Sequence, residues 1–230
     1  MKMLVKISKK IILIITSMIV IFFVNYLVGF GVNQLDIDTS NLEFERILFV
    51  PGINTPNFYL NRWRADLKAN FPDKEAIVLS DNVYVYWQND KIEAIVEKGV
   101  EILNDSKPTI IIAHSYGGVL AKTMIDRANS ADVVELVTMA SPHQMDSFGL
   151  DESKDFLGTP IEVNVPTFSF GGYVDPVVLF PFSEVKDTGG SENLNHQDLW
   201  SGHSGFLTNK DIRKKVLEYV FGVESNKEID

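Results

Sequence analysis

The segment Ile110–Gly118 has the sequence IIIAHSYGG and places a serine where an apolar, strand-like run meets a helical pattern. In such a strand–turn–helix setting, small residues on both sides of a serine allow a sharp, strained turn that exposes its hydroxyl as a nucleophile. Ala113 and Gly117 are the small residues here, and Gly118 allows close packing of the helix. The start of a helix also favours negative charge beside the hydroxyl. The pattern predicts Ser115 as a nucleophile; the alternative is a serine in an ordinary turn.

A serine hydroxyl is a weak nucleophile without an adjacent base, and histidine is the first residue type to consider. The chain has four histidines. His114 lies inside the predicted turn, so its side chain must point away from Ser115 and is expected in a packed or supporting position. His143 follows a predicted strand, and His196 and His203 lie in predicted loops near the C-terminus. From the residues alone, more than one of these could serve as the base.

The elements that must position these residues alternate along the chain. Apolar runs predict strands over residues 46–50, 75–80, 109–113, 133–139 and 165–170, and helical spacing predicts helices over 57–71, 90–103, 117–128 and about 208–221. Thr55-Pro56 predicts an N-cap followed by proline in the first helical position. Residues 82–88 predict an extra extended piece or a substrate-lining loop. Strands alternating with helices indicate a parallel sheet covered by helices on both faces.

Two segments resemble known hydrolases. The sequence AHSYGG is similar to the A-H-S-x-G-G turns of small bacterial lipases, although Ala113 replaces the glycine of the strict motif. Glu135–Gln144, with the sequence ELVTMASPHQ, resembles the L-V-T-L-x-x-P-H-x-G segment of triacylglycerol-lipase-like and inositol-deacylase-like (PGAP-type) proteins, with Met145 in place of the final glycine. Residues 46–221 therefore resemble the α/β-hydrolase superfamily. The resemblance implies the α/β-hydrolase fold, with a mostly parallel sheet, and the short segment 144–166 implies a minimal cap or none.

The resemblance also implies the partners of the nucleophile. In this fold the base lies in a loop before the last helix, which favours His203 over His196 and leaves the histidine at position 143 too early. The acid follows a later strand, and the sequence GGYVDPVV is similar to a G-x-x-D-x-x-V segment that carries it at Asp175. Asp187 is the main rival. The resulting order of Ser115, acid and base is the order of the fold.

An oxyanion formed at a substrate carbonyl needs preorganised N–H donors, each worth about 3–4 kcal/mol in the barrier. The backbone N–H of Tyr116, next to the nucleophile, is the first expected donor. The segment Phe49–Asn54, FVPGIN, resembles the H-G-x loop of lipases, with Pro51 replacing the histidine, so the N–H of Ile53 is the second. The alternative for this segment is a plain Pro-Gly turn.

These residues imply a serine hydrolase that cleaves carboxylic esters through an acyl-enzyme, in the manner of lipases and esterases, without a metal or organic cofactor. The same residues could serve a thioesterase, amidase, peptidase or acyltransferase. A membrane-anchored binding protein on the same scaffold is a further alternative. A transporter subunit would need a second apolar span, and the sequence has no further segment of that length.

An apolar segment precedes the predicted domain. Lys2, Lys6, Lys9 and Lys10 are followed by the uncharged stretch Ile11–Leu35, whose apolar part reaches Val32. Roughly 20 helical residues cross a bilayer, so this stretch predicts a signal anchor, or a signal peptide if it is cleaved. A buried helix of the domain is the third interpretation. The lysines place the N-terminus in the cytoplasm and the domain on the other side of the membrane, or outside the cell if the segment is cleaved.

The expected domains are an anchor or signal at 1–35, a linker at 36–45, the catalytic domain at 46–222 and a charged tail at 223–230. Deletion of residues 1–35 is therefore expected to leave a soluble, folded domain. The net charge is −10, and because four lysines are the only charges before residue 36, residues 36–230 carry −14. Such an acidic body has no electrostatic affinity for nucleic acid or for anionic lipid. The absence of cysteine excludes disulfides, thiolate metal sites and a cysteine nucleophile.

Overall fold

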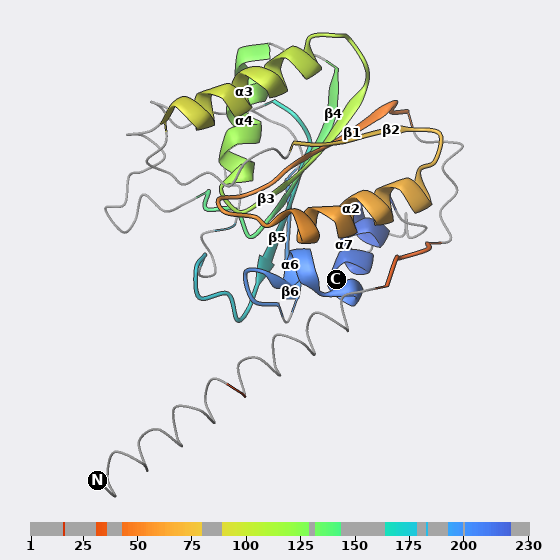
Figure 1. Ribbon diagram of the computed structural model, residues 1–230, viewed down its shortest axis with the longest axis vertical. Helices are drawn as coiled ribbons and strands as arrows, with labels where there is room; N and C mark the ends of the chain where they lie inside the picture. Colours follow the sequence, from red (N-terminus) through yellow and green to blue (C-terminus); the bar gives the residue numbers. More distant parts are fainter. Residues whose placement is uncertain are drawn as a thin grey trace, which may run out of the picture.

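Helices and strands alternate along the chain, and the strands form one parallel sheet (Figure 1). The structure is a computed structural model that describes residues 16, 31–35, 43–79, 89–128, 132–143, 164–178, 183, 193–199 and 201–221. The sheet has six strands in the order β2-β1-β3-β4-β5-β6, and every neighbouring pair is parallel. The parallel sheet expected from the sequence is confirmed.

The first five strands follow the predicted positions closely. They are β1 (Arg46–Val50), β2 (Glu75–Val78), β3 (Thr109–His114), β4 (Val133–Met139) and β5 (Thr167–Gly172). The sixth strand, β6 (Asn193–Leu199, NLNHQDL), was not expected, because its apolar residues Leu194 and Leu199 neither alternate nor form a run. It pairs with β5 through backbone hydrogen bonds at the edge of the sheet, where polar side chains are tolerated.

The helices are α2 (Asn57–Asn70), α3 (Asn89–Leu103), α4 (Gly117–Ala128), α6 (Gly205–Thr208) and α7 (Lys210–Phe221). The single C-terminal helix expected from about residue 208 is wrong in one respect, because Asn209 interrupts it with an extended backbone (φ −84°, ψ 120°). The side-chain oxygen of Asn209 accepts hydrogen bonds from the N–H groups of Asp211 (2.9 Å) and Ile212 (3.3 Å) and so caps α7.

The start of α2 differs from the expectation by one residue. Pro56 has an extended backbone (ψ 141°) and occupies the N-cap position, and Asn57 is the first helical residue. The hydroxyl of Thr55 donates to the carbonyl of Gly52 at 3.0 Å and closes the turn that precedes the helix. Thr55 therefore stabilises the β1–α2 loop and not the helix end.

Helices cover both faces of the sheet: α2, α6 and α7 lie on one face, and α3 and α4 on the other (Figure 1). Successive side chains of a strand point to opposite faces, so the apolar runs of β1 and β3 supply both cores. Ile47 and Phe49 face the α2 and α7 side, whereas Leu48 and Val50 face α3 and α4. All residues of β1 and β3 are buried, which explains why these strands read as continuous apolar runs.

Several predicted segments lie outside the described residues. They are residues 82–88, residues 144–163 of the predicted minimal cap, Asp187, the tail 223–230 and most of the predicted anchor. Within the described part of the chain, no helix is long and apolar enough to cross a membrane. Gly31–Leu35, which the sequence placed at the end of the anchor, lies against α2 and α7, and Asn33 in this segment is buried.

Candidate active site

Ser115 lies in the turn that joins β3 to α4 and has a left-handed backbone conformation (φ 54°). This region is strained for a residue with a side chain and is common at functional sites. The turn is held because the N–H of Ser115 donates to the carbonyl of Met139 at 2.8 Å. A Cβ atom on Gly117 would lie 2.3 Å from the carbonyl oxygen of Val50, so only glycine fits there.

Ser115, His203 and Asp175 form a continuous hydrogen-bonded chain. The Oγ atom of Ser115 lies 2.8 Å from Nε2 of His203, and Nδ1 of His203 lies 2.9 Å from Oδ2 of Asp175. Since a carboxylate can only accept, Nδ1 donates its hydrogen to Asp175 and leaves Nε2 free to accept the Ser115 hydroxyl. The structure thus brings together three residues that lie far apart in the sequence.

The carboxylate of Asp175 is completely buried, whereas the imidazole of His203 is 19% exposed. The second oxygen of Asp175 accepts hydrogen bonds from the N–H groups of Val177 (2.8 Å) and Val178 (3.0 Å). Burial alone would raise the pKa of Asp175, but the hydrogen bonds from His203 and from these backbone N–H groups outweigh it and lower the pKa below its usual value. Asp175 therefore stays ionised at neutral pH, as an acceptor for His203.

The loop that carries His203 is held from two directions. A Cβ atom on Gly172, at the end of β5, would lie 2.2 Å from the carbonyl oxygen of Ser201, so this loop crosses the strand end at close range. His114, the residue before the nucleophile, directs its Nε2 to the carbonyl oxygen of His203 at 2.9 Å. Because a carbonyl only accepts, His114 is the donor. The side chain of His114 thus points away from Ser115 and supports the backbone of His203.

His114 is 3% exposed and is held in its neutral form. Burial, followed by the proximity of His203, lowers the pKa of His114 to about 3. An unfolded histidine has a pKa of about 6.5, so between these values the unfolded chain binds a proton that the folded chain does not bind. The contribution of His114 to stability is complete above about pH 6.5 and is lost as the pH falls toward 3.

We expect His114→Gln to flatten the dependence of the free energy of unfolding on pH between 4 and 6.5 by about one proton, because glutamine keeps an N–H donor but does not titrate there. Urea unfolding at a series of pH values measures this slope. Burial also lowers the pKa of His143 well below its ordinary value. The matched variant His143→Gln should remove a second proton from the slope, and an unchanged slope in both variants would contradict the expectation.

The β1–α2 loop lies directly against the nucleophile. A Cβ atom on Gly52 would lie 2.6 Å from Cβ of Ser115 and 2.9 Å from the carbonyl oxygen of His114, so glycine is required for this approach. Asn54 has a left-handed backbone (φ 52°), which turns the chain after Ile53. The loop that contains Ile53 and the start of α4 after Tyr116 therefore meet at Ser115.

The two other histidines take other positions. His143 lies beyond the end of β4, and its Nε2 lies 3.1 Å from the hydroxyl of Thr138 within that strand. His196 is part of β6 and pairs through its backbone with Phe170. The sequence predicted only that His114 would support the site, and not that it would donate to the carbonyl of His203. The backbone N–H groups of Val177 and Val178 that bind Asp175 could not be identified from the sequence. In the described ranges, no group of three or more His, Cys, Asp or Glu residues could hold a metal ion.

Solved structures with the same architecture cover most of the chain. RedJ, a thioesterase from the prodiginine biosynthetic pathway of Streptomyces coelicolor, has a TM-score of 0.55 and 16% identity, and the match covers 83% of this chain and 90% of that chain. The mature lipase BlEst2 of Bacillus licheniformis has a TM-score of 0.54 and 14% identity, with 85% and 97% covered. Human thioesterase 2 has a TM-score of 0.53 and 12% identity, with 76% and 94% covered.

The chain has the α/β-hydrolase fold. In this fold the nucleophile lies in a strained turn where a strand leads into a helix. Ser115 lies in a turn of this kind, between β3 and α4. Asp175 and His203 follow Ser115 in the order that the α/β-hydrolase fold uses. At these identities the solved structures establish the fold and leave the reaction open.

A family model provides a second, independent similarity. The model of the PGAP1-like alpha/beta domain matches residues 74–161. This range contains β2 to β4, the turn at Ser115 and the segment Glu135–Gln144, but neither Asp175 nor His203. None of the curated proteins matches the chain significantly. The family match therefore includes the turn at Ser115, whereas the placement of Asp175 and His203 comes from the geometry alone.

Proposed function

We propose that this protein is a serine hydrolase that cleaves carboxylic esters, with Ser115 as nucleophile, His203 as general base and Asp175 as the acid that orients His203. The observation that carries the proposal is the hydrogen-bonded chain from Ser115 through His203 to Asp175, with distances of 2.8 and 2.9 Å. These values lie within the range required for proton transfer between a nucleophile and its base.

In the proposed mechanism, Nε2 of His203 accepts the hydroxyl proton as Ser115 attacks the ester carbonyl. Asp175 accepts the hydrogen bond from Nδ1 of His203 and stabilises the imidazolium that forms. The imidazolium then gives its proton to the leaving alcohol. Water, activated by His203 in the same way, attacks the acyl-enzyme and releases the carboxylic acid. The buried, ionised state of Asp175 supports this role, because a neutral acid would not favour the imidazolium.

The oxyanion in this mechanism is stabilised by the backbone N–H groups of Tyr116 and Ile53. Tyr116 begins the turn into α4, so its N–H lies beside the nucleophile in the sequence. The support for Ile53 is the close approach of its neighbour Gly52 to Ser115. Preorganised backbone donors of this kind stabilise the charge of the tetrahedral intermediate without reorganisation.

The ester specificity is supported by the resemblance of Glu135–Gln144 to a segment of lipase-like and PGAP-type proteins and by the family match over residues 74–161. The same three side chains can also cleave a thioester or an amide, since the steps differ only in the leaving group. The choice between these leaving groups is therefore a matter for measurement on the purified protein.

Fluorophosphonate labelling of the full-length protein in detergent tests the proposal. We expect wild type to take up the probe at Ser115 and to hydrolyse p-nitrophenyl acyl esters, and Ser115→Ala to lose both properties. An acyl thioester and an acyl amide assayed in parallel identify the preferred leaving group, and a series of acyl lengths distinguishes lipase-like from short-chain activity. If folded wild-type protein takes up no probe and cleaves none of these substrates, the chain is a binding protein on a hydrolase scaffold.

Substitution of Gly52 tests the second oxyanion donor. We expect Gly52→Ala to lower kcat about 10²–10³-fold, because the new Cβ atom would push the loop that contains Ile53 away from Ser115. A Cβ atom on Gly202, next to His203, would meet only the carbonyl oxygen of Val174 at 3.6 Å, an ordinary contact, so Gly202→Ala is the matched control. Steady-state kinetics on a soluble ester measures both, and equal rates in the two variants would refute the role of this loop.

The N-terminal segment has a function of its own in this proposal. The uncharged, apolar stretch from Ile11 to Val32, preceded by four lysines, acts as a membrane anchor with the hydrolase domain on the extracytoplasmic side. Cleavage of this stretch would instead release the domain as a secreted protein. Fractionation of membranes, with detection of an N-terminal tag that cleavage would remove, distinguishes the two fates.

A further inference from the structure

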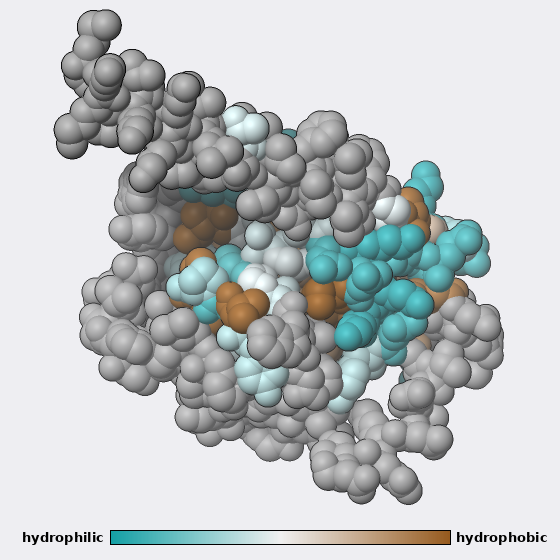
Figure 2. Space-filling model, turned by 90° about the horizontal axis from the view of Figure 1, so that it is seen from below, coloured by the Kyte–Doolittle hydropathy of each residue, from teal (hydrophilic) through white to brown (hydrophobic). Residues whose placement is uncertain are grey.

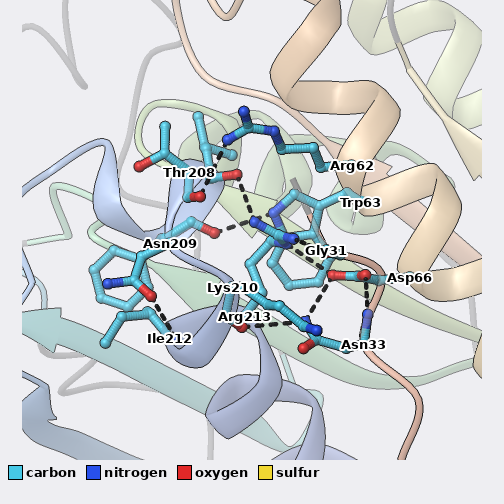
Figure 3. Close-up of polar contacts among 12 residues, drawn as sticks. Gly31, Asn33, Arg62, Trp63, Asp66, Thr208, Asn209, Lys210, Ile212 and Arg213 are labelled. Atoms are coloured by element: carbon cyan, nitrogen blue, oxygen red, sulfur yellow. Dashed lines mark hydrogen bonds and ion pairs between the residues drawn. The ribbon is translucent and has the colours of Figure 1, made fainter. Parts of the chain in front are cut away.

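Residues 31–35, here called the strap, are joined to the domain by a buried polar network (Figure 3). The backbone N–H of Asn33 donates to Oδ1 of Asp66 at 2.7 Å, and its side-chain amide donates to Oδ2 at 2.9 Å. Arg213 donates to the same Oδ2 at 2.7 Å, and both of these charged side chains are completely buried. The strap is therefore held to the domain by hydrogen bonds from Asn33 to a buried, charged carboxylate, and hydrogen bonds to charged groups are among the stronger ones.

The contacts of the strap define the direction in which it runs. Asn33 contacts Asp66 of α2, and the N–H of Leu35 donates to the side chain of Asn70, at the end of the same helix, at 2.7 Å. Because α2 follows β1, its first residues lie at the carboxyl ends of the strands and its last residues at the opposite end. Going backward from Leu35 to Gly31, the strap therefore runs toward the carboxyl ends, where Ser115 lies.

Gly31 itself lies at the start of α7. Its carbonyl accepts a hydrogen bond from Arg213 at 3.3 Å, and a Cβ atom on Gly31 would lie within 2.6 to 2.9 Å of side-chain atoms of Lys210, the first residue of α7. The helix α7 follows α6, which begins two residues after His203. Gly31, the first residue of the strap, thus lies at the end of the molecule that contains the site.

The same helix that holds the strap also holds the element after His203. The indole N–H of Trp63 donates to the carbonyl of Phe206 at 3.1 Å, and Arg62 donates to the carbonyl of Thr208 at 3.1 Å (Figure 3). Both acceptors belong to α6. The strap, α2 and the helix after His203 therefore form one hydrogen-bonded unit, so the position of the strap relative to the site is fixed.

Exposed apolar side chains gather at this end of the molecule. Among the large apolar residues of the described segments, Phe58, Tyr173, Val174 and Val177 are 37%, 53%, 52% and 57% exposed, and Val32 on the strap is 47% exposed. Phe58 is the second residue of α2, and the other three domain residues flank Asp175 after β5. We call these five residues the rim. Figure 2 views the molecule from below Figure 1, the side on which the loop after β5 lies, and shows hydrophobic side chains reaching that surface.

The opposite end provides a contrast. Val134, 40% exposed, is the second residue of β4, and Tyr219, 42% exposed, lies near the end of α7. Both residues lie at the ends of their elements that are opposite to the carboxyl ends of the strands. Their exposure is similar to that of the rim residues, which makes them matched reference positions.

We propose that the strap holds the hydrolase domain in one orientation on the membrane, with the rim and the end of the domain that contains Ser115 facing the lipid surface. The apolar stretch of the sequence reaches Val32, and the strap begins at Gly31, so no spacer separates the segment that enters the bilayer from the segment bonded to Asp66. The acidic domain, with −14 over residues 36–230, has no electrostatic attraction to anionic lipid. The anchor and the apolar rim together provide the contact, in keeping with the two signals that stable membrane association requires.

This inference rests on the proposed anchor and deepens the proposed hydrolase function. An acyl ester that resides in the bilayer would reach Ser115 from the lipid side without first entering water. A soluble ester would reach the same serine from the solvent. The orientation therefore favours membrane-resident esters over soluble ones without requiring any difference in the catalytic residues.

Single cysteines placed in the full-length protein test the orientation. The chain contains no cysteine, so each variant carries one label. Val174→Cys and Phe58→Cys report on the rim, Val134→Cys and Tyr219→Cys on the opposite end, and Val32→Cys on the strap. Each variant is labelled with an environment-sensitive fluorophore and reconstituted in phosphatidylcholine vesicles with and without brominated lipid. We expect brominated lipid to reduce the fluorescence at the rim and strap positions and to leave the two reference positions unchanged.

The outcomes separate the orientation from the catalytic proposal. Quenching of Val32→Cys alone would mean that the domain is held away from the bilayer, and equal quenching at both ends would mean that it has no preferred orientation; either result overturns the inference, as does a protein that stays out of the vesicles. The quenching does not depend on turnover, so it can succeed with Ser115→Ala. If wild-type protein takes up no fluorophosphonate but the quenching pattern is as expected, the proposed hydrolase function is refuted and the orientation stands.

Discussion

Ser115→Ala, His203→Ala and the double variant are each expected to lower kcat about 10⁶-fold, to the same residual rate, because the two residues act as one unit in the attack. The 2.8 Å hydrogen bond between Ser115 and His203 is the structural reason for this non-additivity. Single-turnover kinetics on an activated ester measures the residual rates. Independent roles would instead make the loss in the double variant the product of the two single losses, which would contradict the proposed mechanism.

Asp175→Asn is expected to lower kcat about 10⁴-fold with little change in fold, because the amide can donate to His203 and so favours the wrong tautomer. The two backbone hydrogen bonds to Oδ1 can be kept by the amide oxygen, which limits the structural effect. Asp187→Asn is the matched control, since Asp187 was the rival in the sequence, and it should react at the rate of wild type. A larger loss in Asp187→Asn than in Asp175→Asn would overturn the assignment of the acid.

The fold could be predicted from the sequence wherever burial on both faces leaves a continuous apolar run. Strands β1 and β3 are of this kind, and β4 was predicted to the residue. The polar strand β6 could not be predicted, because its sequence has neither an apolar run nor an alternating pattern and its place in the sheet depends on pairing with β5. The break at Asn209 was hidden for a similar reason, since a capping asparagine within an amphipathic pattern resembles an exposed helical residue.

The site was predictable to the extent that local sequence determines it. The strained turn at Ser115 follows from the small residues around it, and the structure gives that serine a left-handed backbone. The meeting of Asp175 with His203 depends on β5 lying two positions from β3 in the sheet, which local sequence does not encode and which only the resemblance to a fold could suggest. The bond from His114 to the carbonyl of His203 depends on the same long-range arrangement.

The boundary of the domain was the least predictable feature. Residues 31–35 continue an apolar stretch in the sequence, and Asn33 appears there as one more uncharged residue. Its partners, Asp66 and the carbonyl of Lys210, lie 33 and 177 residues further along the chain. A buried polar residue reveals its role only when the groups that satisfy it are known. The truncation at residue 35 that the sequence suggested would therefore remove part of a buried network.

We expect a protein that starts at Gly31 to keep the stability of the domain, and one that starts at residue 36 to be less stable by about 3 kcal/mol. The shorter protein loses the hydrogen bonds from Asn33 to the buried carboxylate of Asp66, and hydrogen bonds to charged groups contribute about 1.5–3 kcal/mol each. For a domain of this size the loss corresponds to a decrease in Tm of roughly 6–12 °C. Thermal unfolding of the two proteins at equal concentration measures the difference.

Point variants within the protein that starts at Gly31 locate the source of that stability. Asn33→Ala should account for most of the difference, because it removes the side-chain donor to Asp66 and opens the network to water. Val32→Ala is the control. Val32 belongs to the same strap but is 47% exposed, so its substitution should change the Tm little. Equal Tm values for the two truncated proteins would show that Asn33 contributes nothing net. In that case the strap would be a loose end, and the fixed orientation on the membrane would lose its physical basis.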